Sequence, residues 1–302
     1  MSSSLLRVQS PAAPPPGTRF PFQPLLHLDE LWIQVAGTLC NLSCTHCFVS
    51  SGPGIERHRL LAREEVRARV AEALPLGVKE FYFTGGEPFV HPDLLAILGD
   101  TLEHGPCTVL TNGTLFTRGR IRALRRLSDG ARYALEIRVS LDGATAAEHD
   151  RLRGPGAFAR ALEGLRRLDR AGLLPIVTVT RAGDEDALAF HERHLAMLRA
   201  AGLRRPRLKV IPMFRLGRER ARSGDYRAEE SLADLPPEAF DPSRLQCSRG
   251  RAVTSRGVFV CPLLVDEPAG AMSDRLAGSL RPFELSHGAC FTCWVTGMSC
   301  GN

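Results

Sequence analysis

The stretch Cys40-Asn-Leu-Ser-Cys44-Thr-His-Cys47-Phe places three thiols close together, with three residues between the first pair and two between the second. Three thiolates can each hold one iron atom of a four-iron cluster and leave the fourth iron without a protein ligand. A metal with an open position can bind and activate a small molecule. The spacing alone also allows a zinc site or three unrelated thiols, although zinc usually takes four ligands from paired clusters.

A second motif follows about one strand and one helix later. Glu80-Phe-Tyr-Phe-Thr84 combines aromatic and β-branched residues with no turn former, which predicts a buried strand. The strand runs directly into Gly85-Gly86-Glu87-Pro88, whose glycines would let the backbone come close to a ligand. Together, the cysteine run and this glycine motif resemble the signature of the radical S-adenosylmethionine (SAM) enzymes.

The resemblance implies two cofactors and a reaction. In that family the three cysteines bind a [4Fe–4S] cluster, and SAM chelates its fourth iron. Reductive cleavage of SAM gives a 5′-deoxyadenosyl radical that takes hydrogen from a substrate. By resemblance, His46 lies beside the adenine, and Gly85, Gly86, Glu87 and Pro88 hold the SAM ammonium group. The resemblance also implies an electron donor of the flavodoxin or ferredoxin type.

A later segment, from Tyr133 to Gly143, resembles the fourth strand of that family, whose Ser and Asp lie near the ribose and methionine portions of SAM. Residues two apart on a strand share a face, so Ser140, Arg138 and Glu136 should line one interior wall. Arg138 and Glu136 could instead form an internal ion pair, because buried charges need partners.

Two further residues are assigned to the SAM site. Asp150-Arg-Leu-Arg153-Gly resembles an Asp-x-x-Arg-Gly stretch of the family. Arg153 is the expected contact of the SAM carboxylate, because a guanidinium binds a carboxylate with two parallel hydrogen bonds. Asn112 follows the strand expected at Cys107–Thr111 and is assigned to the same site.

Strand and helix patterns alternate through the middle of the chain, which predicts a parallel α/β sheet with right-handed crossovers. The strands are expected at Leu31–Val35, Glu80–Thr84, Cys107–Thr111, Ala134–Ser140, Pro175–Thr180 and Arg207–Met213. The helices are expected at Arg63–Leu74, Pro92–Glu103, Thr117–Leu127, Ala157–Ala171 and Glu185–Ala201. Six units suit a partial (β/α)6 barrel, the fold of the radical SAM enzymes by resemblance. The motifs then lie at the C-terminal mouth.

The expected organisation has four parts. Residues 1–28 form a flexible arm, residues 29–216 the barrel, residues 217–246 a polar bridging segment, and residues 247–302 a small cysteine-rich α+β domain. A hairpin is expected in the last part, turning at Arg256-Gly257.

The cysteines of this last part resemble the "twitch" appendage, a shorter form of the SPASM domain. The resemblance implies that Cys247, Cys261, Cys290 and Cys293 hold an auxiliary [4Fe–4S] cluster. Structural zinc is the alternative, because four thiolates also make zinc sites. Cys300 is left over as a substitute ligand, a radical-quenching thiol or a plain terminal cysteine.

Composition narrows the function classes. The formal charge of +6 comes from scattered arginines, which favours solvated helix faces over a nucleic-acid surface. No apolar stretch approaches the roughly 18 residues of a membrane span, and no signal-peptide core is present. Nine cysteines without a secretory signal predict metal ligation in a reducing, cytoplasmic compartment.

The resemblance leaves several reactions open. The leading hypothesis is an oxidoreductase that dehydrogenates or epimerises a small natural-product intermediate, such as a sugar or aminocyclitol. Cys300 would return hydrogen in an epimerase, whereas Glu136 or Asp142 would take a proton in a dehydrogenase. The alternative is a peptide-modifying maturase, although 28 loose residues are too few for a peptide-recognition module. A non-catalytic iron–sulfur or zinc protein is the third hypothesis, and it leaves the Gly85–Pro88 motif unexplained.

Overall fold

The computed structural model describes residues 17–183, 185–297 and 300–301. Within these ranges, one nine-stranded sheet forms the centre of the molecule, in the order β10-β9-β8-β2-β3-β4-β5-β6-β7. Strands β2 to β7 run parallel to one another. Their bounds are Glu30–Ile33, Glu80–Phe83, Cys107–Thr111, Leu135–Ser140, Ile176–Arg181 and Arg207–Pro212. The predicted α/β fold with a parallel sheet is confirmed.

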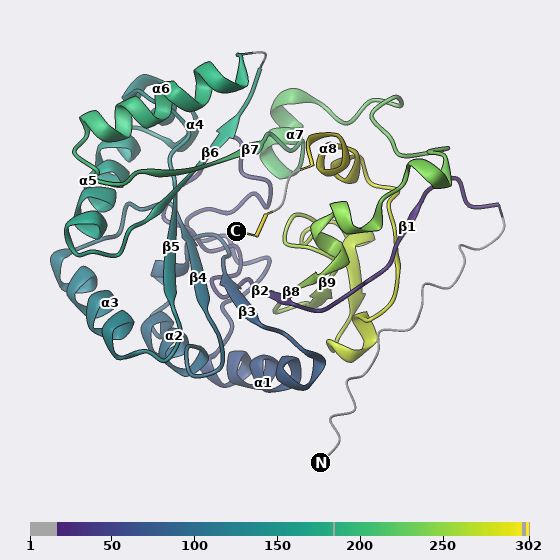
Figure 1. The fold of residues 1–302 in the computed structure, drawn as a ribbon, viewed down its shortest axis with the longest axis horizontal. Helices are drawn as coiled ribbons and strands as arrows, with labels where there is room; N and C mark the ends of the chain where they lie inside the picture. Colours follow the sequence, from purple (N-terminus) through teal and green to yellow (C-terminus); the bar gives the residue numbers. More distant parts are fainter. Residues whose placement is uncertain (1–16, 184, 298–299, 302) are drawn as a thin grey trace.

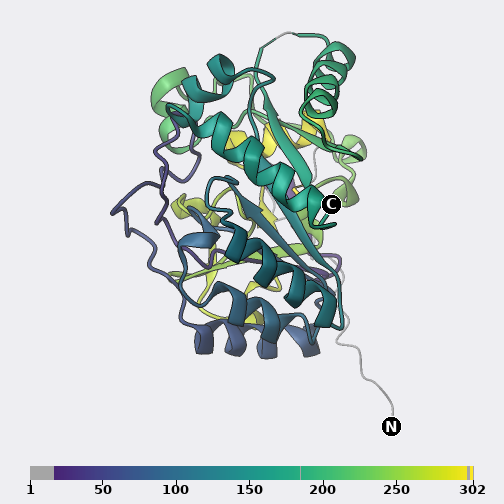
Figure 2. The same cartoon turned by 90° about the vertical axis from the view of Figure 1, so that its left-hand side faces the viewer.

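The helices between these strands cover the outer face of the sheet, as Figures 1 and 2 show for the series from α1 to α6. Their bounds are Arg63–Ala73 (α1), Leu94–Thr101 (α2), Arg118–Gly130 (α3), Ala146–Arg153 (α4), Ala157–Arg170 (α5) and Ala187–Ala200 (α6). Helix α5 shows why the helices pack on the sheet. Its Leu165 and Leu168 are buried, whereas Arg160 and Arg170 on the opposite face are exposed. The sequence analysis missed α4. None of the helices in the described residues is both long and apolar enough to span a bilayer.

The C-terminal part extends the same sheet. Strand β8 (Gly250–Thr254) pairs in parallel with β2 and antiparallel with β9 (Gly257–Phe259), which in turn pairs with β10 (Ala271–Ser273). The expected hairpin is therefore present, but its first strand is hydrogen-bonded to the strand that precedes the cysteine run. The sheet continues across the boundary expected at residue 247.

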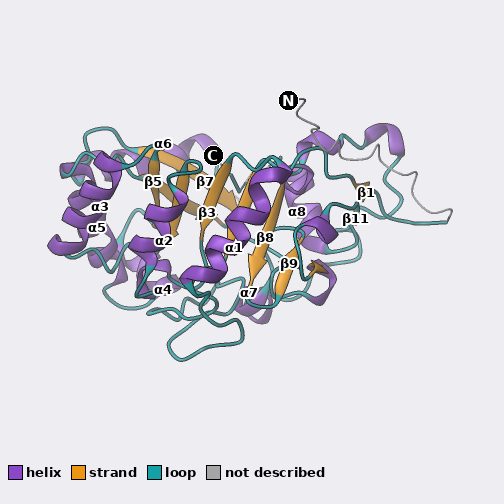
Figure 3. Cartoon of the chain, turned by 90° about the horizontal axis from the view of Figure 1, so that it is seen from below, coloured by secondary structure: helices purple, strands orange, loops and turns teal. Residues whose placement is uncertain are grey.

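Two further helices and a small second sheet are also present. Helices α7 (Gly217–Ser223) and α8 (Gly288–Thr296) flank the C-terminal strands. Strands β1 (Phe22–Gln23) and β11 (Phe283–Glu284) form a separate two-stranded sheet. Figure 3 shows this pair at one end of the molecule, away from the main sheet.

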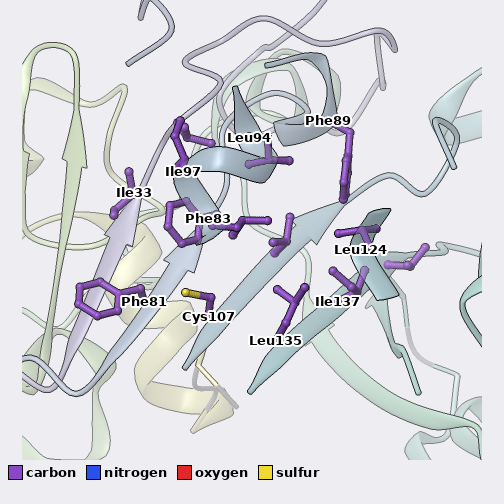
Figure 4. Close-up of a cluster of buried hydrophobic side chains, with 14 of the residues drawn as sticks. Ile33, Phe81, Phe83, Phe89, Leu94, Ile97, Cys107, Leu124, Leu135 and Ile137 are labelled. Carbon is purple, nitrogen blue, oxygen red and sulfur yellow. The ribbon is translucent and has the colours of Figure 1, made fainter. Parts of the chain in front are cut away.

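The hydrophobic core lies between the sheet and its helices (Figure 4). Phe81, Phe83 and Ile137 from the strands pack with Leu94 and Leu124 from the helices, and all five are buried. Cys107 is 1% exposed and also belongs to this core, as expected of an inert thiol at the start of its strand. The core fixes the positions of the strand ends, where the polar motifs lie.

Candidate functional site

The cysteine run lies in the long loop after β2 and is held against the turn after β3. The amide of Gly86 donates to the carbonyl of Gly37 over 2.8 Å, and the amide of Glu87 donates to that of Leu39 over 3.0 Å. A Cβ atom at Gly86 would lie 2.2 Å from the Leu39 carbonyl oxygen. From the sequence, this glycine was expected to allow close approach of a ligand. The structure shows that it is required for close approach of the cysteine loop.

Glu87 is fully buried and holds this turn to the next strand. One carboxylate oxygen accepts from the amide of Phe89 at 3.0 Å and the hydroxyl of Thr111 at 2.7 Å, and the other accepts from the amide of Asn112 at 2.7 Å. Glu87 and Pro88 do not line the cavity described next. The structure shows Glu87 ordering the backbone around the site, and its contact with the SAM ammonium group stays a prediction.

A cavity of about 200 Å³ opens where the parallel strands end. It brings together residues that are far apart in sequence, because the carboxyl ends of parallel strands meet at one edge of a sheet. The predicted site residues that line it are Cys40, Cys44, His46, Cys47, Gly85, Gly86, Asn112, Arg138, Ser140, Asp142, Arg153 and Cys300. Glu136 is not among them.

A buried carboxylate joins three sides of the cavity. Asp142 accepts hydrogen bonds from the side chains of His46 (3.0 Å) and Arg153, and from the amide of Thr180 (2.8 Å). Burial favours a raised pKa for Asp142, but Arg153, His46 and the Thr180 amide outweigh it and hold the pKa well below its ordinary value. A carboxylate so fully bonded is a poor proton acceptor, so the structure does not favour Asp142 as a base.

The two charges expected to share a wall have different partners. Arg138 is 2% exposed and donates to the backbone carbonyl of Cys300 over 2.6 Å. Glu136 instead forms an ion pair with Arg207 over 2.9 Å, away from the cavity. The structure therefore keeps Arg138 and Ser140 at the site and removes Glu136 from it.

Lys209 on β7, which was not singled out from the sequence, is a partly buried amine near the site, although it is not among the residues that line the cavity. It pairs in register with Thr178, which lines the cavity. Burial, followed by the nearby charge of Arg138, lowers the pKa of Lys209 to about 8. An amine with a pKa near 8 can exchange a proton close to neutral pH.

The C-terminal cysteines gather around a second, smaller pocket. Its lining includes all five of them: Cys247, Cys261, Cys290, Cys293 and Cys300. Cys290 and Cys293 are three apart on α8 and so project from the same side of that helix. Cys300 lines both this pocket and the larger cavity. Its backbone amide donates to the side-chain carbonyl of Gln246 over 2.6 Å, which positions it on the shared wall.

Comparison with known proteins shows the family of this chain. Residues 35–186 match the model of the Radical SAM superfamily. The chain belongs to this superfamily. Radical SAM enzymes use SAM and a [4Fe–4S] cluster.

Individual radical SAM relatives share part of the chain. It is 37% identical over 142 residues to an AdoMet-dependent heme synthase of Methanosarcina barkeri, covering 46% of this chain and 38% of the relative. It is 33% identical over 175 residues to the mycofactocin maturase MftC of Mycobacterium ulcerans, covering 55% and 45%. The chain thus spans less than half the length of these relatives.

The fold is also similar to that of Streptococcus suis SuiB bound to the precursor peptide SuiA. The TM-score is 0.60 with 14% identity, covering 83% of this chain and 62% of SuiB. At this identity the likeness shows a shared fold.

The residues present fit the radical SAM cluster. All three thiols are free, and thiolates are the ligands that iron–sulfur clusters take. Backbone amides already point at two of the sulfurs. The amide of Leu42 lies 3.4 Å from the Cys40 sulfur, and that of Ser51 lies 3.3 Å from the Cys47 sulfur. Such donors favour the thiolate form and tune the cluster.

The cysteine loop is also held by helix α7, through contacts that were not predicted from the sequence. In α7, the backbone amide of Arg218 donates to the carbonyl of Cys47 over 3.0 Å, and its guanidinium donates to the carbonyls of Cys44 (2.7 Å) and Ser51. Gly217 has a φ of +53°, and a Cβ there would lie 2.6 Å from the Cys47 carbonyl. No local pattern distinguishes Arg218 from the many other arginines, so only the folded chain reveals it.

Arg218→Gln should loosen the cysteine loop and weaken cluster binding by about tenfold, the lower end of the usual effect of residues that orient metal ligands. The measurement is the chelator concentration that removes half of the SAM-responsive signal in electron paramagnetic resonance (EPR) spectra of the reduced protein. Arg222→Gln is the matched control, because Arg222 lies on the same helix and pairs with Glu219. Equal chelator sensitivity in the two variants would show that Arg218 does not hold the loop.

Proposed function

We propose that this chain is a radical SAM enzyme that modifies a peptide substrate by hydrogen abstraction. The convergence of three cluster-type thiols, Arg138, Ser140 and Arg153 on one cavity supports a SAM-dependent activity. The bound cluster and SAM supply the radical chemistry, in which an electron cleaves SAM and the resulting 5′-deoxyadenosyl radical takes a hydrogen atom. The chain's own residues bind the cofactors and orient the substrate.

Several residues are placed to hold SAM. Cys40, Cys44 and Cys47 would bind the cluster. Arg153 uses its Nε for Asp142, and among the described residues no group accepts from its two terminal nitrogens. These nitrogens are free to bind the SAM carboxylate, as a guanidinium does with two parallel hydrogen bonds.

The remaining contacts follow from the cavity lining. Gly85 and Gly86 present backbone at the cavity, and Asn112 and Ser140 present polar side chains there. His46 is fixed by Asp142 at the edge of the cysteine loop, where its ring can lie against the adenine. A flavodoxin or ferredoxin would supply the electron.

We also propose an auxiliary [4Fe–4S] cluster bound by Cys247, Cys261, Cys290 and Cys293. The grouping of these thiols around one apolar pocket supports it. In the described residues, no three Cys, His, Asp or Glu side chains are arranged to hold one metal ion. A zinc ion would bring its sulfurs within about 4 Å of each other, because each Zn–S bond is only about 2.3 Å. A cluster separates them more widely, since each thiolate binds a different iron.

The relatives of this chain favour a peptide substrate. Two of them are the mycofactocin maturase MftC and the Bacillus subtilis protein AlbA of subtilosin biosynthesis, which is 30% identical over 143 residues. Another relative is a heme synthase, so a small-molecule substrate is the second candidate. A sugar or aminocyclitol substrate, the leading hypothesis from the sequence, has no support among the relatives named here.

Replacing Cys40, Cys44 and Cys47 together by Ala should abolish reductive cleavage of SAM, because the cluster that delivers the electron is lost. The measurement is 5′-deoxyadenosine formed per chain with dithionite as reductant. The same protein should keep four irons and four sulfides from the auxiliary site. Continued SAM cleavage would refute the enzymatic proposal, and a colourless protein with stoichiometric zinc would refute the auxiliary cluster.

Cys300 and Cys290 can be compared in that triple-alanine protein. Cys290→Ala should lose most of the remaining iron, because it removes one of the four proposed ligands. Cys300→Ala should keep it, because Cys300 lies on the wall shared with the larger cavity. Iron and sulfide analysis with EPR decides the point. Equal loss in both variants would make Cys300 a cluster ligand.

The substrate class can be tested with the reconstituted enzyme, SAM and reductant. A short peptide encoded beside the gene should raise 5′-deoxyadenosine formation above the substrate-free level. Mass spectrometry should show a changed peptide, with two hydrogen atoms lost if the product is oxidised. The triple-alanine variant is the control and should give neither effect. Stimulation by a small metabolite with no change in any such peptide would favour the second candidate.

A further inference from the structure

Arg251 on β8 is a fully buried arginine next to the C-terminal cysteines. Its side chain is 0% exposed. Every acceptor that it contacts is a backbone carbonyl. Nη1 donates to Cys247 and Gly250, both at 2.8 Å, Nε donates to Ser279 at 2.9 Å, and Nη2 donates to Arg281 at 3.1 Å. These bonds fix the guanidinium in place, with one edge on the backbone of a proposed cluster ligand.

Among the described residues, no carboxylate pairs with the charge of Arg251. Within residues 17–183, 185–297 and 300–301, no ion pair of Arg251 is found, and the ionisable groups that act on it are Cys247, Cys261 and Arg281. A guanidinium stays protonated inside proteins. A buried charge without a counter-charge is strongly unfavourable. Neutral thiols would leave this charge uncompensated.

Two other arginines of this chain pair with carboxylates. Arg249 lies two residues earlier and pairs with Glu30 over 2.8 Å. Arg153 pairs with Asp142 in the larger cavity. Carbonyl dipoles satisfy the hydrogen bonds of Arg251, but they carry no net charge. An anion that binds beside Cys247 and Cys261 would complete the site.

We propose that Arg251 is the counter-charge of the auxiliary cluster and raises its reduction potential. This inference rests on the proposed cluster at Cys247, Cys261, Cys290 and Cys293. Four thiolates make such a centre an anion, and reduction adds one more negative charge. A fixed positive charge nearby stabilises the reduced form more than the oxidised form, because Coulomb energy scales with the charge. Arg251 is thus a positioning residue of the cluster, not a ligand.

The test uses the triple-alanine protein, in which only the auxiliary cluster remains. The midpoint potential of this cluster is measured by EPR-monitored redox titration in the parent triple-alanine protein and in its Arg251→Gln and Arg251→Lys variants. The neutral variant should lose at least tenfold in the equilibrium constant for reduction, which is about 59 mV for one electron. The lysine variant keeps the charge and should stay close to the parent. Arg166→Gln is the control, because Arg166 also bonds a backbone carbonyl, that of Ala201, but on α5.

The possible results distinguish a failure of the role of Arg251 from a failure of the proposed auxiliary cluster. A triple-alanine protein without iron refutes the auxiliary cluster itself. If the cluster is retained, an unchanged potential in Arg251→Gln refutes the role of Arg251. An equal shift in Arg251→Gln, Arg251→Lys and Arg166→Gln refutes it as well. If Arg251→Gln does not fold, Arg251→Met replaces it, because it also removes the charge at this position. Its potential should also fall, and an unchanged potential refutes the inference.

Discussion

The buried carboxylate of Asp142 is the contact on which the shape of the larger cavity depends. It joins the cysteine loop through His46, helix α4 through Arg153, and strand β6 through the amide of Thr180. Breaking one partner of a buried charge pair typically costs about 3–5 kcal/mol, since the remaining charge stays buried and uncompensated. The network therefore resists distortion. It keeps the three cluster thiols and the expected carboxylate-binding arginine in one fixed arrangement.

The cysteine loop itself has little regular structure, so its position comes from contacts made by other segments. The turn after β3 approaches it through Gly86, and the start of α7 approaches it from another side through Gly217 and Arg218. Both approaches need glycine, because a Cβ atom would overlap a backbone carbonyl of the loop. An open metal site benefits from such a rigid setting, because the protein alone must fix the geometry of its ligands.

The two groups of thiols are parts of one structure. Strand β8 is hydrogen-bonded to β2, so Cys247 and Cys261, which flank the β8–β9 hairpin, are attached to the sheet whose strand β2 leads into the loop of the first three. Cys300 lies on the wall between the two pockets, where Arg138 and Gln246 hold its backbone. A continuous sheet leaves little freedom for relative motion. Under the proposed function, this would hold the two clusters at a constant separation.

Local patterns in the sequence were enough to predict the parallel strands and most of the helices, and they singled out the three thiols of the proposed first cluster. Strands such as Glu80–Phe83 are specified by neighbouring side chains, and cluster ligands are specified by spacing along the chain. The family match confirms the radical SAM assignment that those motifs suggested.

Only the tertiary structure decided the partners of the charged residues. Glu136 and Arg138 are two apart on β5, yet Glu136 pairs with Arg207 whereas Arg138 bonds the backbone of Cys300. Arg218 and Arg251 look like any other arginine in the sequence, but one holds the cysteine loop and the other lies buried beside Cys247. The physical reason is the distance along the chain over which each interaction acts. Strand propensity and ligand spacing act between near neighbours in the chain, whereas a charge interacts with whatever the fold brings close to it.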